Sequence, residues 1–187
     1  MLQIRLFGGV DLRDDGEPIP SPESARASML LAHLLLHRDT PQSRERLAFL
    51  LWPDSTESQA RTNLRHVLHN LRRALPDPDR FLTVTPQTLQ WQPEAGYWLD
   101  VAAFETLAAQ AEAEPEAQQL AALREAVALY TGDLLDGWYD EWVLDERERF
   151  SRQYLQLLER LIDRLEAHGE LAEAIQHGEQ LLRQDQL

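Results

Sequence analysis

The chain has 187 residues and a formal net charge of −14, and 43% of its residues are hydrophobic. This is enough material for one domain or two small ones with a real core, and it excludes wholesale disorder. Cysteine is absent and all 18 basic side chains are arginine, which excludes disulfides, thiolate nucleophiles, cysteine-based metal sites and lysine-dependent catalysis.

The negative charge is concentrated in the second half of the chain. Residues 1–98 hold 11 Arg against 12 Asp and Glu, whereas residues 99–187 hold 7 Arg against 20. The balances of −1 and −13 predict two parts with different electrostatic purposes. The first residues lack a basic segment followed by a long apolar run, and no apolar stretch reaches the roughly 18 residues that a membrane span requires. We therefore expect a soluble, cytoplasmic protein with no membrane partner.

The first half predicts a sheet, three helices and a hairpin, in that order. Alternating apolar and polar residues over 1–20, with a turn signal at Asp14–Gly16, predict a small antiparallel sheet. Residues 81–91, with their turn at Pro86 and Gln87, predict the hairpin. Between them, helical periodicity and capping residues predict three helices, which run from Ser24 to about residue 37, from Ser43 through Leu51, and from about residue 57 to Leu75.

Residues 99–187 predict an almost entirely helical part. Ala and Leu at spacings of three and four give each segment one apolar face. The expected helices cover 101–113, 116–130, 141–168 and 170–183. The last two, joined at Gly169, have the turn and small-residue pattern of a tetratricopeptide hairpin. The spacing to a second, looser copy near 125–129 does not fit a regular array.

The third predicted helix carries the most informative pattern. Its apolar residues fall on one stripe, and four Arg and one Glu give it a local charge of +3. Arginine and asparagine read guanine and adenine in the major groove, and arginine and threonine suit phosphates. A helix that follows a shorter helix and a tight break has the helix-turn-helix order, and the hairpin after it would be a wing.

The candidate DNA-contacting residues lie on this helix, at the start of the helix before it, and in or beside the hairpin. They are Arg44, Arg61, Thr62, Asn63, Arg65, His66, His69, Asn70, Arg72, Arg73, Arg80 and Thr88. The alternative, which the residues leave open, is a solvated basic face on an ordinary amphipathic helix.

Several short segments resemble a known family. Residues Leu50–Trp52 and Leu71–Leu75, together with the order of elements, are similar to OmpR-type winged-helix DNA-binding domains. Arg61, residues 134–136 and Gly169 resemble the SARP-type (antibiotic regulatory protein) transcriptional activators. The resemblance covers essentially the whole chain.

This resemblance implies a mainly α chain with two domains. An α+β winged helix-turn-helix DNA-binding domain would cover 1–98, and an all-α, tetratricopeptide-like bacterial transcriptional activator domain would cover 99–187. The DNA-reading helix of the family then falls on Arg61–Arg73, and its wing falls on Phe81–Trp91.

Two features depart from the family pattern. The wing tip, Thr85–Thr88, is uncharged where family wings often carry a basic residue and a glycine, and Arg80 is the nearest positive group. The chain ends just after a repeat helix, with Gln186 where a repeat usually has proline. We therefore expect a truncated helical domain and, as the relatives imply, further C-terminal domains of the same protein, such as a nucleotide-binding ATPase and further repeats.

Other kinds of site are disfavoured. His33 and His37 have the spacing of metal ligands on a helix, but the glutamate of the metalloprotease motif is missing. His66 and His69 suit DNA contact better than metal binding. The acidic run 133–146 favours aromatic side chains packed between helices, with a partner-facing patch as the alternative. Because no phosphate-binding glycine loop or nucleophile elbow occurs, we expect no catalysis, no metal and no cofactor.

These observations predict a sequence-specific DNA-binding transcriptional activator. The recognition helix, about residues 57–75, would enter the major groove of double-stranded DNA, and the acidic half would mediate dimer or polymerase contacts. The resemblance adds binding to direct repeats, a homodimer, and RNA polymerase holoenzyme as a partner. The alternative is a protein–protein interaction scaffold that binds no DNA and holds a peptide with its tetratricopeptide-like helices.

Overall fold

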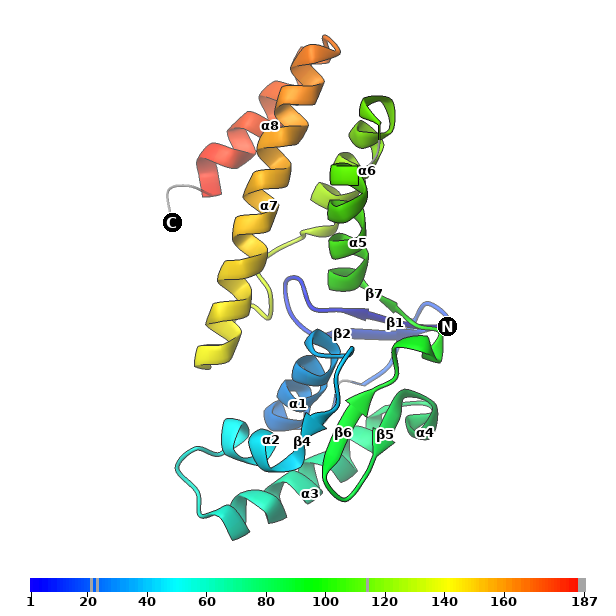
Figure 1. Ribbon diagram of the computed structural model, residues 1–187, viewed down its shortest axis with the longest axis vertical. Coiled ribbons are helices and arrows are strands. Elements are labelled where there is room, and N and C mark those ends of the chain that lie inside the picture. The colour runs from blue at the N-terminus through cyan, green and yellow to red at the C-terminus, as the bar shows by residue number, and fades with distance from the viewer. Residues whose placement is uncertain (21, 23, 114, 185–187) are drawn as a thin grey trace. The chain divides into compact units, whose positions relative to one another are not determined.

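The structure is a computed structural model that describes residues 1–20, 22, 24–113 and 115–184 (Figure 1). The chain divides into two compact units. Unit 1 comprises Met1–Ile4 and Val10–Trp98, and unit 2 comprises Arg5–Gly9 and Leu99–Leu187. Gln186, on which the expectation of a truncated repeat rests, lies outside the described residues.

The first part of the chain contains the predicted sheet, helices and hairpin. Its elements are β1 (Leu2–Arg5), β2 (Asp11–Asp14), β3 (Glu17–Pro18), α1 (Ala25–Leu36), β4 (Gln42–Ser43), α2 (Arg44–Leu51), α3 (Glu57–Ala74), α4 (Pro78–Phe81), β5 (Leu82–Val84), β6 (Thr88–Trp91), the 3₁₀ turn η1 (Pro93–Ala95) and β7 (Trp98–Leu99). The strands form two sheets, in the orders β3-β2-β1-β7 and β4-β6-β5.

Local signals explain where these elements begin and turn. Ser24, Ser43 and Thr56 cap α1, α2 and α3, because each side-chain oxygen accepts a hydrogen bond from the backbone N–H three residues later. Asp15 and Gly16 join β2 to β3 with φ angles of 49° and 86°, the left-handed conformation of a type I′ hairpin turn. The structure therefore confirms Ser43 as the cap of α2, and it shows Ser24 and Thr56 as the caps of α1 and α3.

The core of unit 1 lies between α1 and the elements around it. Helix α1 is buried over most of its length, including Leu30, Leu31 and Leu34. It packs against α2, α3 and β6. Helix α3 is buried along one stripe only, so its opposite side stays open to solvent.

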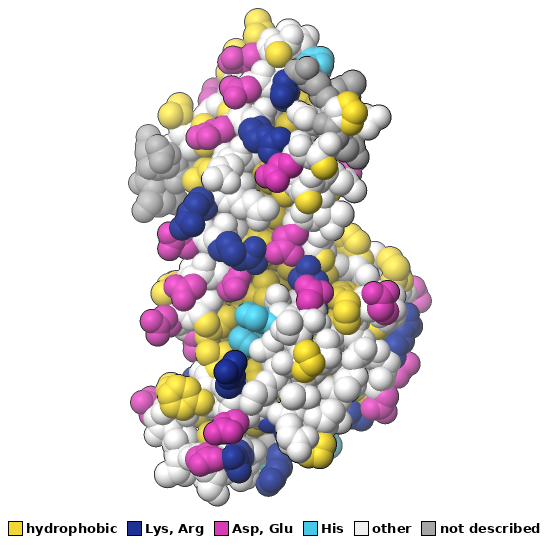
Figure 2. Space-filling model, in the orientation of Figure 1, with side chains coloured by type: hydrophobic (Ala, Val, Ile, Leu, Met, Phe, Trp, Pro, Cys, Tyr) yellow, Lys and Arg dark blue, Asp and Glu magenta, His cyan; other side chains and the backbone are white. Residues whose placement is uncertain are grey.

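Unit 2 is helical, as predicted. Its helices are α5 (Asp100–Ala113), α6 (Glu116–Leu129), α7 (Glu141–Ala167) and α8 (Leu171–Gln184). Consecutive helices pack against each other, and Gly169, with a φ of 77°, makes the turn between α7 and α8. On the face seen in Figure 2, acidic side chains are spread over these helices and interspersed with arginines.

The segment Arg5–Gly9 contributes an aromatic side chain to the core of unit 2. The ring of Phe7 lies 5.4 Å from that of Phe104, 4.8 Å from that of Tyr130 and 5.5 Å from that of Phe150. Phe7 is 4% exposed. Phe7, near the start of the chain, therefore packs against side chains of α5, the end of α6 and α7.

Asp100 fixes the backbone of the same segment. Its side chain, 2% exposed, accepts hydrogen bonds from the backbone N–H groups of Leu6 (2.8 Å), Phe7 (2.9 Å) and Val101 (2.7 Å). Burial raises the pKa of Asp100, against the opposite influence of these three donors. The carboxyl group thus satisfies three buried backbone N–H groups.

The elements outside the predicted set are all short. β4 and β7 contain two residues each, η1 contains three, and α4 contains four. Such lengths are too short to produce a hydrophobic period, so they leave no signal in the sequence. Among the described residues, no helix combines the length and the apolar character that crossing a membrane would need.

His33 gives unit 1 a pH dependence that can be measured. Burial, and then the neighbouring His37, lower its pKa from 6.5 to about 4. The unfolded chain therefore binds a proton between these pH values that the folded chain does not, so stability falls as the pH drops below 6.5. We expect a loss of up to about 2 kcal/mol between pH 7 and pH 5, measured by urea unfolding at both pH values.

The variant His33→Gln should lose this part of the pH dependence, whereas His69→Gln, which removes an exposed histidine, should keep it. An equal pH dependence in the wild type and in His33→Gln would contradict the prediction.

Candidate nucleic-acid interface

Helix α3 has a buried stripe and a polar outer face. Its buried residues are Ala60, Leu64, Val67, Leu68 and Leu71. Among the candidates on the other side, Arg65, His66, His69 and Arg73 are exposed and Asn70 is half-buried. Among the described residues, no hydrogen bond or ion pair engages the side chains of these five. This face therefore carries cations and hydrogen-bonding groups that the fold itself does not use.

The other candidates on α3 are engaged by neighbours. Glu57 pairs with Arg61 one turn away, and Arg72 pairs with Asp79 at 2.7 Å. The Thr62 hydroxyl donates to the Ser58 carbonyl at 3.0 Å. The Gln59 amide donates to the side-chain oxygen of Asn63 at 3.0 Å. The structure thus divides the predicted set into groups with and without an internal partner.

The predicted wing is the hairpin β5–β6, whose register pairs Leu82 with Trp91 and Val84 with Leu89. Two threonines at its tip bond to each other. The backbone N–H of Thr85 donates to the Thr88 carbonyl at 2.9 Å, and the two threonine hydroxyls lie 2.9 Å apart. Thr88 is therefore held within the turn.

Arg44 connects α2 to this tip. Its guanidinium donates to the Thr85 carbonyl at 3.1 Å, and its backbone N–H donates to the Gln87 carbonyl at 2.9 Å. The short strand β4 brings Arg44 there, because Ser43 pairs with Thr88 on β6. The positive group at the wing tip is therefore Arg44.

Arg80 lies elsewhere, which corrects the expectation that it is the cation nearest the tip. Its guanidinium donates to the carbonyls of Ala95 at 2.7 Å and Gly96 at 3.2 Å, and it lies over the ring of Phe81. Arg80 precedes the hairpin in sequence, but it closes the opposite end of β5–β6 and joins that end to η1.

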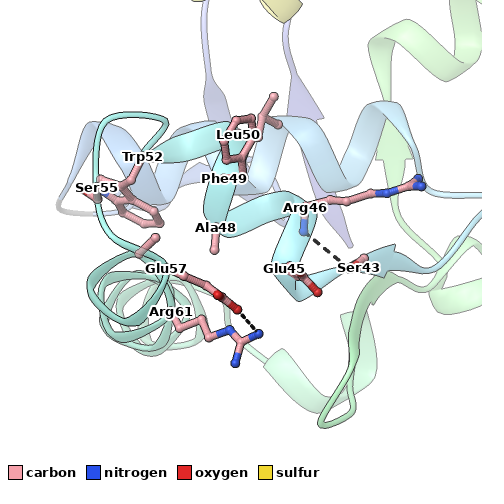
Figure 3. A pocket seen from close by; sticks show the side chains of 11 residues that line it. Ser43, Glu45, Arg46, Ala48, Phe49, Leu50, Trp52, Ser55, Glu57 and Arg61 are labelled. Carbon is pink, nitrogen blue, oxygen red and sulfur yellow. Dashed lines mark hydrogen bonds and ion pairs between the residues drawn. The ribbon is translucent and has the colours of Figure 1, made fainter.

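Two adjoining cavities lie alongside α2 and the start of α3. One, of about 880 Å³, extends from Trp52 and Ser55 to Ser43; the other, of about 570 Å³, reaches Pro86 and Gln87 at the wing tip. Ser43, Glu45 and Arg61 line both cavities, so together they form one groove. Figure 3 shows the paired Glu57 and Arg61 on α3 and Glu45 on α2 beside the same open space.

The groove contains residues that the sequence reasoning missed. Glu45 lines the groove together with Arg44, Arg61 and Arg65, and Glu57 lines it beside Arg61. The spacing of Glu57 and Arg61, four residues apart on a helix, is a signal from which their ion pair could have been predicted. The position of Glu45 beside α3 depends on how the helices pack and has no such local signal.

The histidine pair considered as a metal site forms a stack. The rings of His33 and His37 lie 4.2 Å apart with an angle of 19° between their planes. The described part of the chain brings together no group of three or more side chains that could hold a metal ion.

The aromatic side chains of the acidic run 133–146 differ in burial. Trp138 and Trp142 are half-buried, whereas Tyr139 is 78% exposed. The guanidinium of Arg147 donates to three backbone carbonyls of the loop before α7, at 2.8–2.9 Å. The loop is thus tied down while one aromatic side chain faces solvent.

Comparison with known proteins assigns the second half of the chain. Residues 99–187 match the bacterial transcriptional activator domain family. The segment that matches contains all four helices of unit 2. The bacterial transcriptional activator domain expected from the resemblance is therefore confirmed for this part of the chain.

The whole fold is similar to that of a solved protein. The structure of Mycobacterium tuberculosis EmbR, in complex with a low affinity phosphopeptide, matches with a TM-score of 0.81 and 23% sequence identity. The match covers 96% of this chain and 49% of that chain, so this chain spans about half the length of EmbR. No curated protein matches the sequence significantly. The fold is thus mainly α as predicted, with a small sheet-containing first part and a helical second part that matches the bacterial transcriptional activator domain.

Proposed function

We propose that this chain is a sequence-specific DNA-binding transcriptional activator whose helix α3 enters the major groove of double-stranded DNA. The observation that carries the proposal is the outer face of α3, where Arg65, His66, His69 and Arg73 are exposed and hold no partner within the described residues. The match of residues 99–187 to the bacterial transcriptional activator domain supports a role in transcription.

The roles of the side chains follow from their chemistry. Arg65 and Arg73 can pair through two N–H groups with a guanine edge or with a phosphate. His66, His69 and Asn70 offer hydrogen bonds to base edges or to the backbone. Thr62 and Asn63 are already bonded within α3, so they contribute less.

Residues 99–187 serve partners other than DNA in this proposal. Their charge balance of 7 Arg against 20 Asp and Glu repels phosphates, which leaves α3 and the wing as the DNA-reading part. The acidic helices would then contact a second copy of the chain or RNA polymerase holoenzyme. Binding to direct repeats belongs to the same proposal.

The test is a selection of binding sites from a randomised DNA duplex pool with this chain, at near-physiological salt. We expect recovery of a repeated element with half-sites about one helical turn apart, because two reading helices on one face of DNA require that spacing. The selected duplex should then bind at least about 1000-fold more tightly than a scrambled one.

Recovery of no sequence above background, for the chain alone and for a dimer forced by a fused coiled coil, would contradict the proposal. Selection of a peptide by the same protein, with no affinity for DNA, would instead favour the scaffold function.

A further inference from the structure

The ion pair between Glu57 and Arg61 lies in the groove beside the wing. The Arg61 side chain is 54% exposed and that of Glu57 is 67% exposed. An exposed pair of this kind on one helix contributes little to stability, since water screens both charges. Arg61 can therefore exchange this carboxylate for a stronger partner at little cost.

The groove would attract a single anion only weakly as it stands. Arg44, Arg61 and Arg65 line it, and Glu45 lines it as well. Arg44 already donates to the Thr85 carbonyl, and Arg61 is held by Glu57. Arg65 is thus the one of these three cations with no partner among the described residues.

A DNA phosphate differs from a carboxylate in ways that matter for Arg61. It offers oxygens that match the planar fork of the guanidinium, and its binding releases condensed counterions. When Arg61 turns to a phosphate, the carboxylate of Glu57 loses its partner and stays close to a second negative charge. The internal pair therefore opposes binding twice, by occupying the cation and by repelling the anion.

We propose that the groove between α2, the start of α3 and the wing tip seats one phosphodiester of the DNA backbone, and that Glu57 competes with this phosphate for Arg61. The inference rests on the proposed function and adds an internal competitor to it. Because a phosphate carries no sequence information, Glu57 lowers the affinity for every duplex equally and makes stable binding depend on base contacts.

The variant Glu57→Gln tests the competition. We expect it to bind both the selected duplex and a scrambled duplex about fivefold more tightly than the wild type, measured by fluorescence anisotropy over a range of salt concentrations. The gain should disappear when Arg61 is also replaced by alanine. Glu94→Gln is the matched control, since it removes an exposed carboxylate of η1 outside the groove, and it should change affinity by less than about twofold.

A chemical change in the DNA tests the same contact without touching the protein further. A methylphosphonate replaces one charged phosphate by a neutral group, and it can be scanned through the selected duplex. At one position in each half-site, the difference between the wild type and Glu57→Gln should vanish.

The outcomes separate the two proposals. A wild type that binds neither duplex overturns the proposed function, and the competition with it. A wild type that binds the selected duplex, with no gain in Glu57→Gln or with a gain that persists without Arg61, overturns the competition alone. Thermal unfolding of each variant shows whether α3 is intact, because Glu57 lies in its first turn.

Discussion

Replacing Arg65 and Arg73 together by alanine is expected to lower the affinity for the selected duplex about 100-fold. Both side chains lie on the outer face of α3 and neither holds an internal partner among the described residues. Their removal thus costs DNA contacts and leaves the packing of α3 unchanged. The slope of log affinity against log salt should fall by about 1 for each phosphate contact that is lost. Anisotropy titrations from low to physiological salt measure both quantities.

The matched control for this variant removes two arginines from unit 2. Arg152 on α7 and Arg183 on α8 are exposed, and their replacement by alanine changes the net charge by the same amount. We expect this control to change the affinity by less than about threefold. Equal binding by the wild type and the Arg65/Arg73 double variant would refute α3 as the recognition helix.

Replacing Phe7 by alanine is expected to destabilise unit 2 by about 3–5 kcal/mol. Phe7 packs against Phe104, Tyr130 and Phe150, so the substitution removes the centre of an aromatic cluster and leaves a cavity. Hydrogen exchange followed by mass spectrometry separates the units, because peptides from α5–α8 report on unit 2. We expect faster exchange in these helices.

An exposed phenylalanine provides the control for this prediction. Phe49 on α2 is 71% exposed, so its replacement by alanine should lower the free energy of unfolding by less than about 0.5 kcal/mol. If Phe7→Ala accelerates exchange only in α1–α3, the assignment of this residue to the core of unit 2 is wrong.

The sequence predicts the helices of this protein well because their signals are local. The cap at Ser43, the stop after Leu51 and the stripe of α3 lie within single elements. Each of these signals depends on a capping side chain or on a helical period, and both can be recognised from the sequence alone. The basic outer face of α3 was predictable for the same reason.

The wing shows where local signals end. Arg80 is close to the tip along the chain, yet Arg44 is the residue that contacts it. The difference arises from strand β4, which directly precedes α2 and pairs with β6, so that it brings Arg44 to the tip. This strand contains only two residues. A strand of this length has no period, so the cation at the tip could be found only from the structure.

The role of Phe7 could not be predicted from the sequence either, because its partners are far away along the chain. Its ring partners, Phe104, Tyr130 and Phe150, all lie far along the chain, and Asp100, which accepts a hydrogen bond from its backbone N–H, is 93 positions away. Contacts of such separation impose no pattern on neighbouring residues. The alternation that predicts β1 therefore gives no sign that residues 5–9 leave unit 1.

The placement of residues 5–9 also sets an order of events during synthesis. Phe7 emerges from the ribosome early, but the ring of Phe150 that it contacts is made last among its partners. At synthesis rates of about 5–20 residues per second, Phe7 waits on the order of ten seconds for that partner. Residues 10–98 can fold in this interval, whereas the helices of unit 2 must recapture a segment made before them. The aromatic cluster around Phe7 is therefore incomplete until α7 is present, and a chaperone that binds apolar segments has that time to act.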